Sequence, residues 1–583
     1  MHPLRAFQPG RAALLCALFV CAFFFQTSIL KAQGNFTNTD AGTEFLLVFM
    51  ANESSGYDPS STRYQDIYLI SAGDTATVTL TCKAFPGFKK IISLAANGSS
   101  TYRISTDPVI GYPAHDAIIE SSEVVDPTVF KVVSTSPIIC YGHNNKNLTG
   151  DAFLALPKSI ATTDYLVMSY GNSSQLPGLE MPSEFCVASF DDEDTVTITP
   201  TGVTRSGRPA GQLLKFVLNS GEAVQIQTDP LTSNLDLTGS RIVSSKSTVV
   251  YGGHARTEVP SGFRFNQSVS RNHIAEQIPP LQLWGKLFIA KNTGRTDGDV
   301  VRIVSGTDNT VIKINGNVWG KPLRISEFRD TLIPFSAIAV DNTIAIETSS
   351  PTLVGLIGHS APDAGEIGDA FLAMISPLER SFNDFRYFIP TDPNFLADEQ
   401  FVVIVTEISG VGKISKDGVT IPALAFTEIP TPLGGKHYAI TTLNQSRGVF
   451  DIVSENLPEL GMTVLVYGFG SANAYGYTAG GFSRPAKNTV TKSVSNFPVL
   501  ENFPNPAIAN TTIRFNMPNA AFASVKIYDA LGRVVRVVSQ SVMSEGEHSL
   551  NVNTFGLAAG SYTIELLAPE IGVSEHSSMI VME

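Results

Sequence analysis

One short pattern returns along the chain at nearly constant spacing. An apolar run followed by Gly occurs four times, and in the first three copies His comes next: residues 136–143, 247–254, 350–359 and 462–468. The glycines are Gly142, Gly252, Gly358 and Gly468, so the steps are 110, 106 and 110 residues. Self-similarity at a fixed period is the signature of a repeat architecture. The pattern predicts about four related units, over residues 41–160, 161–280, 281–380 and 381–480.

Each unit is expected to consist of β-strands. Thr alternates with apolar residues at 75–80 and 194–199, and shorter strands are expected at 310–314 and 411–414. Period-two alternation with β-branched residues indicates half-buried strands. Asn315-Gly316 suits a tight hairpin turn, and helical periodicity is nearly absent. The predicted fold class is all-β, with modules that form sandwiches in series or sheets about a common axis.

The first 32 residues predict the cellular compartment of the protein. Arg5 and Arg11 precede an apolar run at 12–25, and small residues lead to Ala32, so residues 1–32 are expected to be a secretory signal peptide. No later stretch approaches about 18 consecutive apolar residues, and no transmembrane segment is expected in the mature chain. Three cysteines remain there, which allows one disulfide and a free thiol but no disulfide framework: Cys82, Cys140 and Cys186.

Charge excludes one class of partner. The 583 residues include 40 Lys and Arg against 53 Asp and Glu, a formal net charge of −13. No basic stripe interrupts this balance, so the counterion release that drives nucleic-acid binding is missing. Nucleic acid is therefore not an expected partner.

The C-terminal part differs from the repeats. Residues 481–496 are polar and rich in Lys and Ser, which predicts a linker, and residues 497–583 form a separate small β domain. This domain resembles the type A sorting domain of the Bacteroidota type IX secretion system in four ordered phrases at 502–506, 511–518, 525–533 and 557–562. The motif positions are Asn502, Pro504, Asn505, Pro506, Asp529, Gly532, Arg533, Gly560 and Tyr562.

The resemblance implies a small Ig-like β-sandwich that serves as an export address. The type IX secretion machinery is the implied partner, and the implied location is the medium or the outer cell surface, reached through the periplasm. Members of the family usually end near a basic residue, whereas this chain closes with Met582 and Glu583. Cleavage of the domain and attachment of the body to polysaccharide stay open.

The body is similar to the N-terminal domain of the IgG Fc-binding protein family. The phrases lie at 183–188, 218–227, 236–243, 273–280, 284–286 and 301–304. The motif positions are Gly221, Glu222, Gly239, Ser240, Glu276, Gln277, Pro279, Pro280, Trp284 and Gly285. Members often carry cysteines before the Glu-Gln-x-Pro-Pro phrase, but residues 255–272 contain none. The animal member is associated with mucus and IgG Fc, which implies a ligand of glycoprotein kind without identifying its binding residues.

Several residues invite a chemical interpretation. His143, His254 and His359 occupy equivalent repeat positions and could converge on a metal, but strand-end hydrogen bonding is the favoured interpretation. Trp284 could stack on a sugar, although core packing is favoured. Cys140 stands three residues before His143, but an apolar strand surrounds it.

Acidic residues offer two further hypotheses. The run Asp191–Asp194 could ligate calcium, but a solvated turn is favoured because the spacing of a calcium loop is missing. Asp363, Glu366 and Asp369 could act as paired carboxylates in glycoside hydrolysis. The motifs G-x-S-x-G, H-E-x-x-H and G-x-x-x-x-G-K-[ST] do not occur. We predict no catalytic residue, metal or cofactor.

Together these features predict a non-enzymatic, secreted or cell-surface β-repeat protein, an adhesin or envelope component. Its ligand would be glycoprotein, mucin-like or polysaccharide material. The alternatives are a surface glycan hydrolase whose carboxylates meet only in the fold, and a structural sheath protein.

Overall fold

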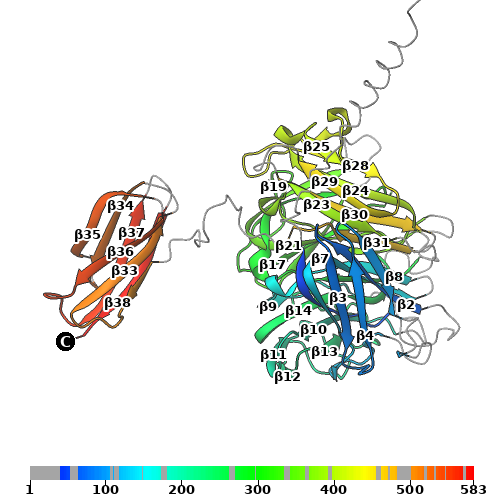
Figure 1. The fold of residues 1–583 in the computed structure, drawn as a ribbon, viewed down its shortest axis with the longest axis horizontal. Coiled ribbons are helices and arrows are strands. Elements are labelled where there is room, and N and C mark those ends of the chain that lie inside the picture. Colours follow the sequence, from blue (N-terminus) through cyan, green and yellow to red (C-terminus); the bar gives the residue numbers. More distant parts are fainter. Residues whose placement is uncertain are drawn as a thin grey trace, which may run out of the picture. The chain divides into compact units, whose positions relative to one another are not determined.

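The chain divides into two compact units, Met1–Arg484 and Pro485–Glu583, in the computed structural model (Figure 1). The structure describes residues 40–52, 63–104, 109–110, 117–146, 149–171, 180–260, 270–295, 297–333, 342–361, 367–390, 397–454, 461–470, 473–481, 500–517, 521–530, 533–544, 546–568 and 573–582. The predicted signal peptide and residues 482–496 of the predicted linker lie outside these residues. The boundaries proposed for the units, linker and C-terminal domain stay predictions.

The first unit repeats one order of strands four times, and we call the repeats modules 1 to 4. Module 1 contains β1 (Gly42–Leu47), β2 (Arg63–Ser71), β3 (Ala76–Cys82), β4 (Lys89–Leu94), β5 (Ser99–Arg103), β7 (Phe130–Lys146) and β8 (Thr149–Ala155). Module 2 contains β9 (Thr162–Leu166), β10 (Ser183–Ser189), β11 (Asp194–Thr199), β12 (Leu214–Leu218), β13 (Glu222–Gln227), β14 (Arg241–Thr257) and β15 (Asn272–Gln277). The short strand β6 (Val125–Asp126) leaves module 1 and pairs with β13.

Modules 3 and 4 follow the same plan. Module 3 contains β16 (Gly285–Lys291), β17 (Asp299–Ser305), β18 (Ile312–Ile314), β19 (Asn317–Val318), β20 (Phe328–Ile333), β21 (Thr343–Ile357) and β22 (Leu372–Met374). Module 4 contains β23 (Asp384–Ile389), β24 (Ala397–Glu407), β25 (Ile414–Lys416), β26 (Val419–Thr420), β27 (Thr427–Glu428), β28 (Tyr438–Asn444), β29 (Gly448–Ser454), β30 (Met462–Gly470) and β31 (Asn473–Thr478).

One long strand organises each of the first three modules. The first half of β7 pairs with β1 and β3, and its second half pairs with β2 and β8. Strands β14 and β21 do the same, while module 4 divides this strand into β29 and β30. Burial alternates along the first half of β7 and becomes continuous in the second half. The repeated apolar run that ends in Gly lies in this second half, which other strands cover on both faces.

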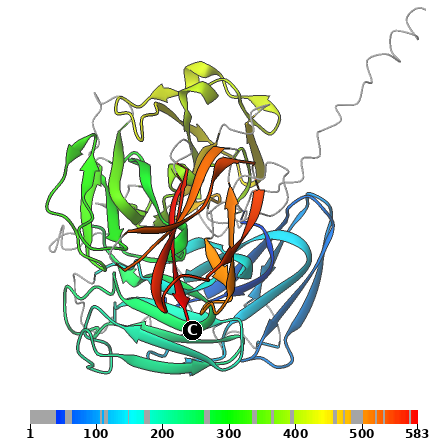
Figure 2. The same ribbon diagram turned by 90° about the vertical axis from the view of Figure 1, so that its left-hand side faces the viewer.

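The four modules form a closed ring around a common axis (Figure 2). The last strands β8, β15, β22 and β31 contact one another at the centre. Neighbouring modules also meet farther out, and the ring closes where Tyr68 of module 1 packs against Phe388 of module 4 with ring centroids 4.5 Å apart. Sheets about an axis, and not sandwiches in series, are therefore the arrangement that this chain adopts.

A short proline-capped turn leads from each of the first three modules to the next. The turns are η2 (Lys158–Ile160), η3 (Leu281–Leu283) and η4 (Leu378–Arg380), and each follows a proline. Proline has its backbone angle preset for such a start and lacks an N–H that would be left unpaired there. The other 3₁₀ turns in the described part are η5 (Ile408–Gly410) and η6 (Ala423–Ala425).

The second unit is a β-sandwich. One sheet contains β32 (Glu501–Phe503), β33 (Asn510–Met517) and β36 (Gly546–Asn553). The other contains β34 (Ala521–Tyr528), β35 (Val534–Met543), β37 (Gly560–Ala568) and β38 (Val573–Val581). Their inner faces share a core that includes Ile513, Val525 and Ile564.

The all-β prediction is confirmed, with one local error. Residues 411–413 are not a strand, since they follow η5, and β25 begins at Ile414. Among the described residues, no helix is long and apolar enough to cross a membrane.

Candidate functional site

The ring axis is lined with polar groups. Each innermost strand has a sheet partner on one side only, so its other backbone edge faces the axis. The carboxylate of Asp151 on β8 accepts hydrogen bonds from the backbone of three innermost strands. The donors are Ala152 N of β8 at 2.9 Å, Leu372 N of β22 at 3.1 Å and Ala275 N of β15 at 3.2 Å. Burial raises the pKa of Asp151 well above its usual range, and these N–H groups, with that of Gly476, oppose the rise. One carboxyl therefore ties all four innermost strands together.

Side-chain amides complete this arrangement. Asn272 accepts from Gly150 N at 2.7 Å and donates to Gly150 O at 2.8 Å and Ala370 O at 2.7 Å. Gln277 accepts from Leu156 N at 2.7 Å. These amides imitate a neighbouring strand, because an amide carries both a donor and an acceptor.

Glu276 lies beside this network and is fully buried. Burial first, and the nearby Asp151 carboxyl second, raise the pKa of Glu276 well above its usual range. This carboxyl has no solvent-facing surface from which to act on a ligand.

The repeat histidines lie at their strand ends and are buried. Tyr68 Oη lies 3.4 Å from His143 Nδ1, Arg256 N donates to His254 Nδ1 at 3.1 Å, and His359 Nδ1 lies 2.6 Å from Ser360 O. Burial lowers the pKa of His254 to about 3 and lowers that of His359. The described residues contain no group of three His, Cys, Asp or Glu side chains placed to hold a metal ion.

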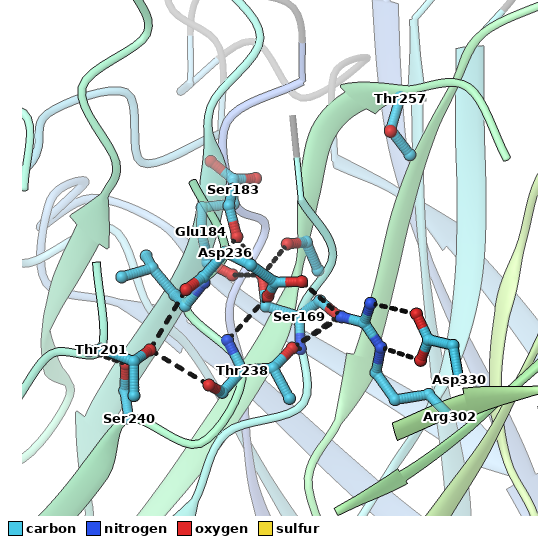
Figure 3. A network of polar contacts seen from close by, with 12 residues as sticks. Ser169, Ser183, Glu184, Thr201, Asp236, Thr238, Ser240, Thr257, Arg302 and Asp330 are labelled. Atoms are coloured by element: carbon cyan, nitrogen blue, oxygen red, sulfur yellow. Dashed lines mark hydrogen bonds and ion pairs between the residues drawn. The ribbon is translucent and has the colours of Figure 1, made fainter. Parts of the chain in front are cut away.

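A buried arginine joins modules 2 and 3 (Figure 3). Arg302 on β17 pairs with Asp330 of its own sheet through Nε at 2.8 Å and Nη2 at 2.7 Å, and Nη1 reaches Asp236 at 2.6 Å. Nη1 also donates to Ser169 O and Thr238 Oγ1, both at 2.8 Å. Burial disfavours the charged guanidinium, but Asp236 and Asp330 outweigh it and raise the pKa of Arg302. We call this group the Arg302 clamp.

A second clamp joins modules 4 and 1. Arg386 pairs with Asp451 through Nε at 2.7 Å and Nη2 at 2.8 Å, while Nη1 donates to Ser71 O at 3.1 Å and Asn97 Oδ1 at 2.6 Å. The plan is that of the Arg302 clamp: two nitrogens bind an aspartate in the same module, and the third reaches across the interface. Bidentate arginine pairs suit this use because the guanidinium fork is rigid.

Two of the shared motif positions, Glu222 and Gly239, contact a neighbouring module. Glu222 follows Gly221 and forms an ion pair with Lys83 of module 1 at 3.3 Å. Gly239 adopts a φ of +84°, and any Cβ there would collide with Ser326 O of module 3. Ser240 Oγ accepts from Thr201 N at 3.0 Å.

Three further motif positions lie beside η3 and at the start of β16. Trp284 is 5% exposed and donates from Nε1 to Pro279 O at 3.0 Å, so its face is unavailable to a sugar. Pro280 caps η3. A Cβ on Gly285 would meet the ring of Pro377. Of the motif positions, Glu222, Gly239 and Gln277 contact a neighbouring module, while the contacts of Ser240 and Gly285 lie within their own modules.

Of the acidic candidates, the structure describes Asp369 and the run Asp191–Asp194. Asp363 and Glu366 lie outside the described residues. Asp369 is 1% exposed, and burial raises its pKa to about 6. Within Asp191–Asp194, Asp194 is buried and its Oδ1 accepts from Ser245 N at 3.0 Å and Lys246 N at 2.9 Å, which fixes a turn.

All three cysteines of the body are buried and reduced. Burial raises the pKa of Cys82 to about 11 and raises those of Cys140 and Cys186. The disulfide that three cysteines would allow is therefore not formed among them.

In the second unit, the sorting-motif residues secure the C-terminal strand. Asn505 donates from Nδ2 to Ser578 O at 2.8 Å and accepts from Ile580 N at 2.8 Å. This pairing extends the hydrogen-bonded edge of β38 next to Pro504 and Pro506. Asn502 Nδ2 lies 3.3 Å from Thr511 Oγ1.

Two other phrases fix turns. Asp529 accepts from Arg533 N at 3.0 Å and Nε at 2.8 Å, and Gly532 lies outside the described residues. Tyr562 Oη donates to Ala558 O at 2.7 Å, an arrangement like the tyrosine corner of Ig-like sandwiches. Gly560 begins β37.

Two hollows contrast in character. A void of about 20 Å³ between modules 3 and 4 has mostly apolar walls, among them Ile289, Met374 and Val464. A hollow of about 490 Å³ on the surface of module 4 has charged walls.

Sequence reasoning missed this hollow and both arginine clamps, since their parts lie far apart in the chain. The sequence did hold a signal for Asp151, because this residue belongs to a six-residue phrase that occurs identically at 150–155 and 368–373.

The geometry defines a class: a closed ring of β modules, held by buried polar contacts, with a separate sorting domain. A family model described as IgGFc binding protein matches residues 151–468, more than half of the chain, and the chain belongs to this family. A model described as secretion system C-terminal sorting domain matches residues 501–580. Both resemblances predicted from the sequence are confirmed.

Individual relatives are distant. The human IgGFc-binding protein is 24% identical over 285 residues, which cover 48% of this chain but only 5% of the human protein. The structure of PorZ, a bacterial surface component of the type IX secretion system of Porphyromonas gingivalis, is 22% identical, covers 20% of this chain and 15% of that chain, and has a TM-score of 0.12. Native Escherichia coli alpha-2-macroglobulin is 9% identical, covers 93% of this chain and 40% of that chain, and has a TM-score of 0.13.

The sorting domain identifies the route of this protein. It is exported by type IX secretion to the cell surface or the medium, and the machinery of that pathway is a partner. The two matched families are not enzyme families.

Proposed function

We propose that this protein is a non-enzymatic surface binder of glycoprotein, mucin-like or polysaccharide material. Membership of the IgGFc binding protein family is the observation that carries the proposal. The ring adds support, because its buried chemistry is already used in holding modules together. Asp151 and Arg302 both serve neighbouring strands, and Trp284 is packed inside.

Recognition then belongs to the exterior of the ring. Loops and outer strands on a rigid scaffold are the usual carriers of binding residues. Four modules around one axis present comparable surfaces several times, so weak contacts with a repetitive polymer would add through multivalency. A repetitive glycan or a densely glycosylated protein fits such a surface.

Binding of the full chain to an array of glycans and glycoproteins, including mucin and IgG Fc, tests this proposal. We expect binding to at least one glycan or glycoprotein class, without turnover of it. A chain that is folded but binds nothing on the array, nor its own cell envelope, contradicts the proposal. Light scattering separates a binder from a sheath protein, since the sheath alternative requires self-assembly of the purified chain.

A further inference from the structure

The charged hollow of module 4 consists of six residues on three segments. Its walls are Glu407, Ile408, Ser409, Glu428, Lys436 and His437, and its volume is about 490 Å³. Ligand pockets of proteins usually measure about 300–1,000 Å³. The hollow therefore has room for a small ligand or for one end of a polymer.

The backbone under these side chains is well fixed. Glu407 on β24 stands opposite Tyr438 on β28, and Ile408 N donates to His437 O at 3.0 Å. Leu433 and Lys436 exchange two backbone hydrogen bonds of 2.9 Å, which closes a tight turn between them. The charged groups are thus mounted on ordered strands and one short turn.

The charged groups of the hollow pair with one another, and a ligand can replace these pairings. Lys436 Nζ forms an ion pair with Glu407, and His437 Nδ1 lies 3.6 Å from Glu428 Oε1. The Lys436, His437 and Glu428 side chains are about 58–63% exposed. Exposed pairs of this kind contribute little to stability. A ligand can therefore take over their hydrogen-bonding groups at small cost.

The chemistry of the walls selects among ligands. Carboxylates only accept hydrogen bonds, and an ammonium group only donates them. Two carboxylates repel a phosphate or another anion, and one aliphatic side chain, Ile408 at 38% exposed, is too little for an apolar ligand. Neutral sugars combine donor and acceptor hydroxyls with an apolar C–H face, which matches this set.

We propose that the hollow is a saccharide subsite. Glu407 and Glu428 accept hydrogen bonds from sugar hydroxyls, Lys436 and His437 donate to hydroxyl or ring oxygens, and Ile408 packs against the C–H face. This assignment rests on the proposed function and deepens it, because it places one contact for neutral glycans on a particular module.

The test uses the full chain on an array of neutral hexose and N-acetylhexosamine glycans. The double variant Glu407→Gln and Glu428→Gln removes both carboxylates but keeps the size of the side chains. The matched control is Glu347→Gln, since Glu347 forms a comparable exposed ion pair with Lys313 on module 3 at 3.0 Å. Thermal unfolding of all three proteins checks that the ring is intact.

We expect the double variant to lose at least tenfold in affinity for the glycans that the wild-type chain binds, and E347Q to bind as wild type. Glycan binding that the double variant retains in full overturns the subsite and leaves the proposed function standing. If the wild-type chain binds none of the glycans on the array, the subsite and the glycan part of the proposed function fall together. An equal loss in E347Q also overturns the assignment, because the effect is then not specific to the hollow.

Discussion

The innermost and outermost strands of each module are both edge strands, but their free edges are treated differently. At the axis, side chains of neighbouring modules occupy the open backbone edges, as Asn272 does for Gly150. At the outside, β4, β12, β19 and β26 end their sheets. The outermost strands expose one large aliphatic residue each: Ile91 at 65%, Val217 at 55%, Val318 at 66% and Val419 at 71%.

In the proposed function, the innermost strands belong to the scaffold and the outermost strands belong to the surface for recognition. Residues of the shared motif, such as Gly239 and Gln277, lie where modules touch. Their contacts serve packing between modules and indicate no ligand. The proposed function places recognition on the exterior, where these packing contacts do not constrain the sequence.

The largest expected effect is at the axis. Asp151→Ala leaves buried N–H groups of three other strands without an acceptor, and each such group costs about 1–3 kcal/mol. We expect the ring to lose at least about 4 kcal/mol of unfolding free energy or to fail to fold, with Asp151→Asn losing less. Both tryptophans of the chain, Trp284 and Trp319, lie in the ring, so urea unfolding followed by their fluorescence reports on the ring alone. Wild-type stability of D151A would show that the axis does not join the modules.

The second-largest loss of unfolding free energy is expected at the arginine clamps. Arg302→Met leaves Asp236 and Ser169 O facing an apolar side chain, and breaking a buried pair of this kind costs about 3–5 kcal/mol. Arg241, whose pair with Asp164 is exposed, is the matched control, and Arg241→Met should cost at most about 1 kcal/mol. The same urea unfolding measures both, and equal losses would contradict an interface role for Arg302.

Two buried histidines should make stability depend on pH. Burial lowers the pKa of His254 to about 3 and that of His273 to about 4, so the unfolded chain takes up these protons first as the pH falls below about 6.5. This loss grows until the pH reaches the folded-state pKa, and each histidine lowers the unfolding free energy by roughly 2 kcal/mol between pH 6.5 and 4.5. The buried carboxyls of Asp369, Asp151 and Glu276, whose pKa burial raises, have the opposite slope.

A variant isolates the histidine effect, because Asp369 acts alike in both proteins. We expect the unfolding free energy of His273→Gln to decline less between pH 6.5 and 4.5 than that of wild type. Parallel pH profiles for the two proteins would contradict the assignment.

The smallest effect is expected at the outer strands. Val217→Thr and Val318→Thr keep the β-branched shape on an exposed strand, and such surface changes usually stay within about 0.5 kcal/mol. A loss of several kcal/mol in either variant would mean that the outer edges are covered in the native protein, as the sheath alternative requires.

Local patterns predicted the repeat, but not its contacts. The glycine spacing predicted four units. From the sequence alone, a closed ring and a string of modules were both possible, because closure depends on contacts such as Arg386 with Ser71, far apart in the chain. Gly239 was a motif position without an assigned role, because its role depends on the approach of Ser326 O from the next module. The module 4 hollow was invisible, since its walls meet only when β24, β27 and the Leu433–Lys436 turn come together.

Binding of the full chain to the glycan and glycoprotein array tests the central claim most directly. The account predicts binding to glycan-bearing material by a wild-type chain and by Arg241→Met, with loss in the Glu407→Gln and Glu428→Gln double variant. A correctly folded wild-type chain that binds no glycan, mucin or glycoprotein on the array would contradict the claim that the ring is a scaffold for external recognition.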